Sequence, residues 1–227
     1  MSTDTARRQI LEGIAAALDE RGSSATERQA VVAARRAAPP PPLIPDRAPA
    51  DADGRAAYFC ARAGETSATT ARLAAMEDLP AAVGAYLGAR NTNPIKAQPR
   101  AVFTALHWPP LEVNFGPAAD SDGIGLVLAD GAAAETGTLF LMSGPEAPTA
   151  LNFLPETLIA VLPLGVLAGD YEAAWRIVRS AAGNDFPPRT VNWISGPSRS
   201  ADIEQRVLMG VHGPRNLHII LVDGDGA

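Results

Sequence analysis

Cysteine is nearly absent from this chain, since Cys60 is the only one among its 227 residues. A single thiol excludes an internal disulfide, a thiolate zinc cage and an iron–sulfur cluster held by cysteines of this chain alone. The three histidines, His107, His212 and His218, have no recognised zinc spacing. We therefore expect no metal and no cofactor, in a chain suited to a reducing compartment.

Basic charge and long apolar runs are also scarce. Asp and Glu number 25 against 19 Lys and Arg, so the formal net charge is −6. No basic stripe is available to bind a phosphate backbone, which makes nucleic acid a poor candidate partner. Residues 1–20 carry charges in every turn and match neither a signal sequence nor a membrane span. These patterns predict a cytoplasmic protein without a membrane span.

Nucleotide-binding glycine motifs are missing as well. The segment GIGLVLADG, residues 123–131, has neither the lysine of a P-loop nor the third glycine of the dinucleotide-binding fingerprint. The sequence therefore does not support binding of ATP or NAD.

Three regions are predicted from composition. Residues 1–35 are expected to form a helical extension, because Ile10, Ile14 and Leu18 recur every four residues. A proline-rich linker is expected at 36–53, since a proline run favours extended chain over helix. Residues 54–227 then form one α/β domain, predicted to contain a mixed, largely parallel sheet flanked by helices.

Apolar patterns locate the elements of this domain. A buried strand is expected at 56–63, a helix interrupted near Pro80 at 73–87, and a short strand near Val102 within a loop region. Three further apolar strands are predicted at 123–131, 138–144 and 158–164.

The last third of the domain reads as a strand–helix–strand unit. Asp170 is a suitable N-cap for a helix ending near residue 182. A strand at 191–195, a helix at about 201–211 and a strand at 217–223 follow. In such units the strands are parallel, and ligands tend to bind beyond their carboxyl ends.

The loop after residue 194 is dense in polar groups. Gly196 and Pro197 predict a tight turn, after which Ser198 and Arg199 lead into the expected helix, whose first N–H groups can bind an anion. Arg199 is the residue expected to hold a ligand carboxylate, although it can instead pair with an acid of its own loop. The remaining candidate ligand-binding residues of this region are Ser195, Ser200, Asp202, Glu204 and His212.

Two alternatives stay open for that loop. Asp202 and Glu204 would lie in the first turn of the expected helix, where they complement the helix dipole and repel a phosphate. Ser200 then serves as the N-cap, and His212 caps the carboxyl end of the same helix.

A second polar motif is AETGTLFL, residues 134–141. Glu135 is the candidate catalytic group, as a nucleophile or general base, and the competing interpretation is a hydrogen-bond acceptor for nearby loop amides. Additional ligand-binding candidates lie in this motif and at the end of its strand: Thr136, Gly137, Thr138, Ser143 and Gly144.

Three segments together resemble the LUD domain family: AETGTLFL, ISGPSRSADIE at 194–204, and GVHGP at 210–214. The resemblance spans roughly residues 120–223, and Ser200 replaces an expected threonine. It implies a fold like that of ribose phosphate isomerases, glucosamine phosphate deaminases and CoA transferases. It also implies a role in oxidising L-lactate to pyruvate alongside separate iron–sulfur subunits.

Two functions are consistent with these observations. The first is an accessory or substrate-handling subunit of a lactate-oxidising complex, in which iron–sulfur partner proteins carry the electrons. The second is a stand-alone enzyme acting on a small phosphorylated or CoA-linked anion through Glu135 and Arg199.

Overall fold

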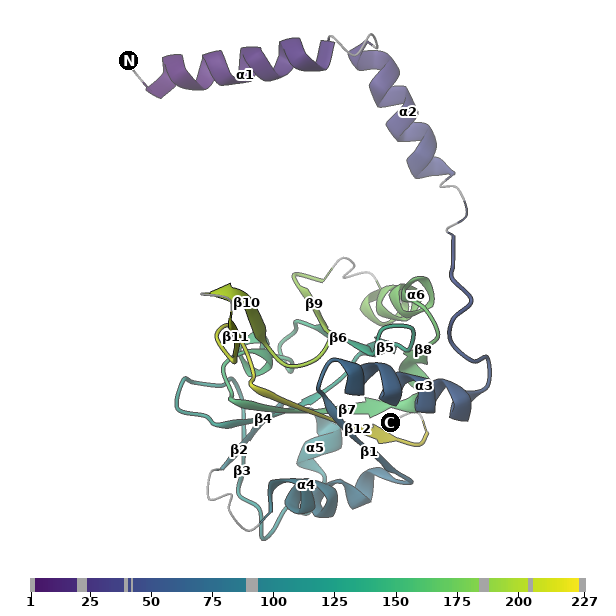
Figure 1. The fold of residues 1–227 in the computed structure, drawn as a ribbon, viewed down its shortest axis with the longest axis vertical. Helices are drawn as coiled ribbons and strands as arrows, with labels where there is room; N and C mark the ends of the chain where they lie inside the picture. Colours follow the sequence, from purple (N-terminus) through teal and green to yellow (C-terminus); the bar gives the residue numbers. More distant parts are fainter. Residues whose placement is uncertain are drawn as a thin grey trace. The chain divides into compact units, whose positions relative to one another are not determined.

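A computed structural model describes residues 3–19, 24–38, 41, 43–88, 94–183, 188–203 and 206–224 (Figure 1). The chain divides into two units, Met1–Leu43 and Ile44–Ala227. None of the described helices is long and apolar enough to cross a membrane.

The first unit contains two helices, α1 (Thr3–Asp19) and α2 (Ala25–Ala37). Helix α2 begins at a capping box, in which Ser24 and Glu27 each bond the other's backbone N–H. The apolar side chains expected along α1 are all exposed: Ile10, Leu11, Ile14 and Leu18.

The second unit is built on a six-stranded sheet in which every neighbouring pair is parallel. Its strands, in spatial order, are β1 (Thr69–Leu73), β12 (Asn216–Val222), β7 (Thr157–Pro163), β4 (Ile124–Leu128), β2 (Ile95–Ala97) and β3 (Val113–Phe115). Strands β7 and β12 are buried along almost their whole length, as expected for a parallel sheet covered on both faces.

Alternate residues of the central strands enter two separate cores. Leu158 and Ile219 pack on one face with α3 (Ala52–Glu65), whereas Ile159 and Ile220 pack on the other. Figure 1 shows α4 (Leu79–Leu87) and α5 (Ala101–Thr104) on this second side of the sheet.

A smaller mixed sheet lies on the α3 side. Its strands, in spatial order, are β8 (Leu167–Ala168), β5 (Gly131–Ala133), β6 (Thr138–Met142) and β9 (Val191–Ile194). Helix α6 (Tyr171–Ala182) packs on its outer face. Strands β10 (Arg199–Ile203) and β11 (Arg206–Met209) form a separate antiparallel pair. Short 3-10 helices among the described residues are η1 (Met76–Asp78), η2 (Thr149–Asn152) and η3 (Leu164–Val166).

The predicted fold class, a largely parallel α/β sheet flanked by helices, is confirmed. Helix α6 begins as predicted, because the Asp170 side chain accepts a hydrogen bond from Ala173 N–H at 2.7 Å. The apolar segments expected near 124, 138, 158 and 217 are strands β4, β6, β7 and β12.

Two predictions in the first half of the domain were wrong, and a third, the helix at 73–87, was right only from Leu79 on. Residues 56–63 lie in helix α3, where Ala56, Phe59 and Ala63 bury one face at helical spacing. The segment from residue 73 is a strand end followed by α4, and Pro80 lies in its first turn, where the missing N–H costs nothing. Val102 lies in helix α5 rather than in a strand.

The prediction of a strand–helix–strand unit near the carboxyl end of the domain was also wrong. The helix expected at 201–211 is replaced by strands β10 and β11. Strand β9 pairs antiparallel with β6 in the smaller sheet, whereas β12 belongs to the parallel sheet. The roles of Ser200 as a helix N-cap and His212 as a helix C-terminal residue are therefore excluded.

Candidate functional site

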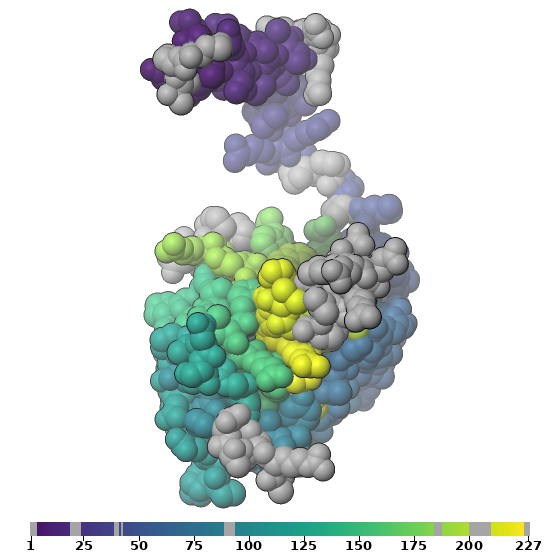
Figure 2. Space-filling model, turned by 60° about the vertical axis from the view of Figure 1, so that its left-hand side comes forward, coloured from purple at the N-terminus to yellow at the C-terminus, as the bar shows by residue number. Residues whose placement is uncertain are grey.

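A cleft of about 250 Å³ opens where β9 passes the amino ends of β7 and β12. This is the opposite end of the parallel strands from the one where ligands were expected. Its lining contains an apolar base and a polar rim: Asn152, Phe153, Leu158, Trp193, Ile194, Ser195, Gly196, Pro197, Ser198, Arg199, His212, Gly213, Pro214 and Leu217. In Figure 2 the yellow C-terminal segment reaches the surface.

The turn after β9 forms one wall of the cleft and is held in place by its backbone. Gly196 has φ +82°, and a Cβ there would lie 2.7 Å from the backbone oxygen of Thr66. The Ser198 N–H donates to Pro214 O at 2.8 Å, and its carbonyl accepts from Gly210 N–H at 2.9 Å. Glycine is therefore required at this close approach, which joins the turn to two distant parts of the chain.

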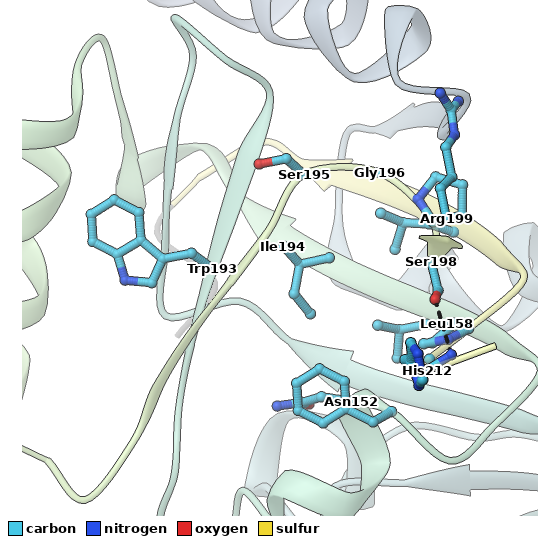
Figure 3. Close-up of a pocket in the computed structure, with 14 residues that line it drawn as sticks. Asn152, Leu158, Trp193, Ile194, Ser195, Gly196, Ser198, Arg199 and His212 are labelled. Carbon is cyan, nitrogen blue, oxygen red and sulfur yellow. Dashed lines mark hydrogen bonds between the residues drawn. The ribbon is translucent and has the colours of Figure 1, made fainter. Parts of the chain in front are cut away.

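Ser198 and His212 lie next to each other on this wall of the cleft (Figure 3). The Ser198 hydroxyl oxygen accepts a hydrogen bond from the His212 backbone N–H at 3.3 Å. His212 is exposed, so its ring is available at the rim of the cleft.

Arg199 lies on the same rim, but its guanidinium is directed elsewhere. Its Nη2 donates to Thr66 O at 2.6 Å and also to the Ser67 hydroxyl. Figure 3 shows the group turned away from Ser198 and His212. Arg199 therefore links the rim of the cleft, through hydrogen bonds, to the turn between α3 and β1. Its positive charge lies near the cleft, although the side chain does not point into it.

Asn152 was missed by the sequence analysis. It lies at the end of η2 and lines the cleft with only 3% of its surface exposed. Its Oδ1 atom is buried without a hydrogen-bond partner among the described residues. The available signal was a single amide within an otherwise apolar run, between Leu151 and Phe153.

The AETGTLFL motif, residues 134–141, lies beside the cleft and does not line it. Thr138 Oγ1 is at hydrogen-bond distance from Thr136 Oγ1 (2.7 Å), Tyr171 OH (2.9 Å) and Ser195 Oγ (2.6 Å). Ser195 also lines the cleft, so one hydroxyl joins the two motifs. These hydroxyl groups satisfy one another, which is typical of a structural polar cluster.

Glu135 and Gly137 serve packing in this structure. Glu135 is buried, and its Oε1 accepts a hydrogen bond from Tyr171 N–H at 3.0 Å at the start of α6. Gly137 has φ +65°, and a Cβ there would lie 2.5 Å from Ala63 N of helix α3. Both residues therefore connect the motif to neighbouring helices.

The remaining candidates do not join the cleft. The Ser143 hydroxyl accepts a hydrogen bond from Thr190 N–H at 3.0 Å, and Gly144 forms a bridge with Ala147 beyond β6. Ser200 and Asp202 lie in strand β10, and Glu204 is outside the described residues. In the described part of the chain, no group of three His, Cys, Asp or Glu side chains could hold a metal ion.

An adjoining depression of about 600 Å³ shares Phe153, His212 and Gly213 with the cleft. Its charged lining is mainly acidic, with Asp120, Asp122 and Glu156 against Arg215: three carboxylates and one guanidinium. Such a lining opposes the binding of a highly charged anion.

Comparison with known proteins places these residues in a family context. The model of the LUD domain family matches residues 54–222. Lactate utilization protein C of Shouchella clausii is 37% identical over 105 residues, which is 46% of each chain. The protein of the same name from Geobacillus kaustophilus is 39% identical over 106 residues, 46% of this chain and 44% of the relative. The aligned part thus spans just under half of these curated relatives.

A solved structure supports the fold. The crystal structure of a DUF162 family protein from Deinococcus radiodurans superimposes with a TM-score of 0.60 at 23% identity. The match covers 77% of this chain and 99% of that structure.

Proposed function

Because the chain belongs to the LUD domain family, we propose that it takes part in lactate utilization as a substrate-handling subunit. The observation that carries this proposal is the similarity to relatives named lactate utilization protein C, at 37% and 39% identity. The cleft lies within the residues that the family model matches, so we assign the binding of the small acid to it.

The lining of the cleft supports a small carboxylic acid as ligand. Its volume of about 250 Å³ lies below the range of sites for drug-sized ligands. Ser198 supplies a hydroxyl, His212 supplies a ring that can donate a hydrogen bond, and Arg199 adds positive charge at the rim. A hydroxyl and an imidazole suit a carboxylate, and the apolar base suits a short carbon chain.

Electron transfer is assigned to separate iron–sulfur proteins. Oxidation of lactate requires an electron carrier, and Cys60 is the one cysteine of these 227 residues, whereas a cluster needs several thiolate ligands. We place this activity in the cytoplasm, because a free cysteine suits a reducing compartment.

The alternative, a stand-alone enzyme for a phosphorylated or CoA-linked anion, has less support. The larger part of such a ligand would extend from the cleft into the depression lined by Asp120, Asp122 and Glu156, which repel phosphate. Glu135, the candidate nucleophile for that chemistry, accepts a backbone hydrogen bond and does not line the cleft.

A thermal-shift screen of the whole chain against lactate, pyruvate, CoA and sugar phosphates tests the proposal. A ligand that binds only the native state raises the apparent stability. We expect lactate or pyruvate to raise the melting temperature, and the shift to shrink in His212→Ala. The matched control is Arg176→Ala, an exposed residue of α6 outside the cleft, which should keep the full shift. A shift with CoA or a sugar phosphate alone would instead favour the enzyme hypothesis.

Partnership with iron–sulfur proteins needs its own experiment. The chain is coexpressed with a cysteine-rich candidate partner, and the two are purified anaerobically through a tag on this chain. Coelution of the partner's iron and sulfide in a fixed ratio supports the subunit role. Elution of this chain alone, with an intact cluster remaining on the partner, would contradict it.

A further inference from the structure

Helices α1 and α2 carry their large apolar side chains on the surface. Each of these side chains is between 39% and 63% exposed: Ile10, Leu11, Ile14, Leu18, Val31 and Val32. No described side chain of either helix is buried. Helices of 17 and 13 residues are marginal in water on their own, because most helical stability in proteins comes from packing of an apolar face. These two helices therefore need a surface that covers them.

The family domain does not account for these apolar faces. The LUD domain model begins at residue 54, whereas the unit that contains α1 and α2 is Met1–Leu43. Both helices thus lie outside the part of the chain that the family shares. Their exposed faces are an addition to the domain, and an addition of this kind is suited to association.

The apolar side chains of α1 form one continuous stripe. Ile10, Ile14 and Leu18 recur every four residues, so that at 3.6 residues per turn they drift only about 80° around the helix. Arg8 and Glu12 lie on another side of the helix, where their side chains form an exposed ion pair at 3.9 Å. Two such stripes can face each other while the charged groups stay in solvent.

The charge of the first unit suits association with a second copy. Residues 1–43 contain six arginines and five acidic residues, a net charge of +1, whereas residues 44–227 carry −7 of the chain's total of −6. Two copies of the acidic domain repel each other, so the nearly neutral unit is where two chains can approach at the lowest electrostatic cost. A surface with charges of both signs can also pair with itself, as a two-fold interface requires.

The size of the unit also fits an interface between two copies. A specific protein–protein interface takes about 20–30 residues from each partner. Helices α1 and α2 together offer 17 and 13 residues, with an apolar stripe and charged flanks. The two helices are thus large enough to form such an interface.

We propose that a second copy of this chain covers these faces, so that the protein is a dimer held together by α1 and α2 of both copies. This inference goes beyond the proposed function and does not depend on it. In a two-fold interface each residue acts twice, once from each copy, so a single substitution in the stripe has a doubled effect.

Analytical ultracentrifugation of the full chain over a range of micromolar concentrations tests the inference. We expect the wild-type chain to sediment as a dimer. In Ile14→Lys the dissociation constant should rise about hundredfold, because each copy would bury an unpaired charge. Lysine forms helices at least as well as isoleucine, so a lower helix propensity would not explain the loss. Val31→Lys makes the same change on α2 and should also weaken the dimer.

The matched control is Ala16→Lys. Ala16 is exposed and lies two residues beyond Ile14, about 200° around the helix, so the added charge points away from the stripe. The control should keep the wild-type dissociation constant. Tryptophan fluorescence checks the domain in every variant, because Trp108, Trp175 and Trp193 all belong to the second unit. The spectrum should stay unchanged.

Three outcomes would overturn the inference. A monomeric wild-type chain would show that something other than a second copy covers the helices. A dimer that persists in Ile14→Lys or in Val31→Lys would place the interface elsewhere. An equal loss in Ala16→Lys would show that the association does not depend on the apolar stripe.

Discussion

The two polar motifs of this chain, AETGTLFL at 134–141 and the turn at 194–200, both contain hydroxyl and charged residues, but they differ in what their hydrogen bonds do. In AETGTLFL, the groups of Glu135, Thr136 and Thr138 bond to the chain itself. In the 194–200 turn, Ser198 makes one long side-chain bond, and the nearby Asn152 Oδ1 makes none among the described residues. Paired polar groups contribute to the stability of the fold, whereas the partly exposed Ser198 hydroxyl can still bond to a ligand in the cleft.

Both motifs nevertheless depend on the same helix. Gly137 approaches the backbone of Ala63, and Gly196 approaches Thr66, just beyond the end of α3. The contrast therefore concerns side chains, while the backbone of both motifs is held equally closely. Substitutions can test this contrast, because changes in AETGTLFL should alter stability and changes in the 194–200 turn should alter ligand binding.

The largest expected effect is that of Gly137→Ala. The new Cβ would lie 2.5 Å from Ala63 N, and φ at this position is +65°. Because steric overlap and backbone strain add, we expect the free energy of unfolding to fall by about 3 kcal/mol or more. Urea unfolding measures the loss. Gly144→Ala is the control, since nothing lies within 4 Å of its added Cβ. Equal midpoints for the two variants would contradict the close approach.

The buried histidine His218 should make the stability of the fold depend on pH. Burial lowers the pKa of His218 from 6.5 to about 4, so the neutral ring is favoured in the fold. The unfolded chain binds more protons between these values, so stability is complete above about pH 6.5 and falls by about 1–2 kcal/mol towards pH 4. Urea unfolding across this range measures the change, and His218→Leu should flatten this part of the profile. A wild-type stability constant over the range would refute the effect.

Thr138→Val removes a hydroxyl from the satisfied cluster at nearly constant volume. We expect a loss of about 1 kcal/mol in the free energy of unfolding, because Thr136, Tyr171 and Ser195 lose a shared partner. Lactate affinity should stay unchanged. A double-mutant cycle with Tyr171→Phe checks the coupling, and strictly additive losses would argue against a connected cluster.

Ser198→Ala should have the smallest effect on stability, within about 0.5 kcal/mol, since its side-chain bond is long and half-exposed. Its effect on lactate affinity should be larger, about fivefold, because a ligand contact is removed. Parallel thermal melts and titrations distinguish the two. A stability loss as large as that of Thr138→Val would remove the contrast between the motifs.

Sequence reasoning succeeded where the local pattern has one physical solution. The LUD family resemblance is confirmed. Continuous apolar runs became the buried strands β4, β7 and β12, and Asp170 capped α6. Five of the candidates predicted between residues 194 and 214 line the cleft, Ser195, Gly196, Ser198, Arg199 and His212, and their binding of a ligand stays a prediction.

It failed where an apolar pattern fits both helix and strand. The 56–63 run was too short to decide by periodicity alone, although Asp51, which caps α3 by accepting from Gly54 N–H at 2.7 Å, was a usable signal. The helix expected at about 201–211 is replaced by strands β10 and β11, so Asp202 lies in a strand and has no helix dipole to complement.

The sequence by itself determined the family, the two-faced apolar strands and the polar content of the two motifs, because these follow from residue type and local spacing. Only the tertiary structure decided which polar groups remain unsatisfied. Thr138 meets its partners across three elements, and Asn152 meets none among the described residues, because burial and hydrogen bonding depend on segments far apart in the chain.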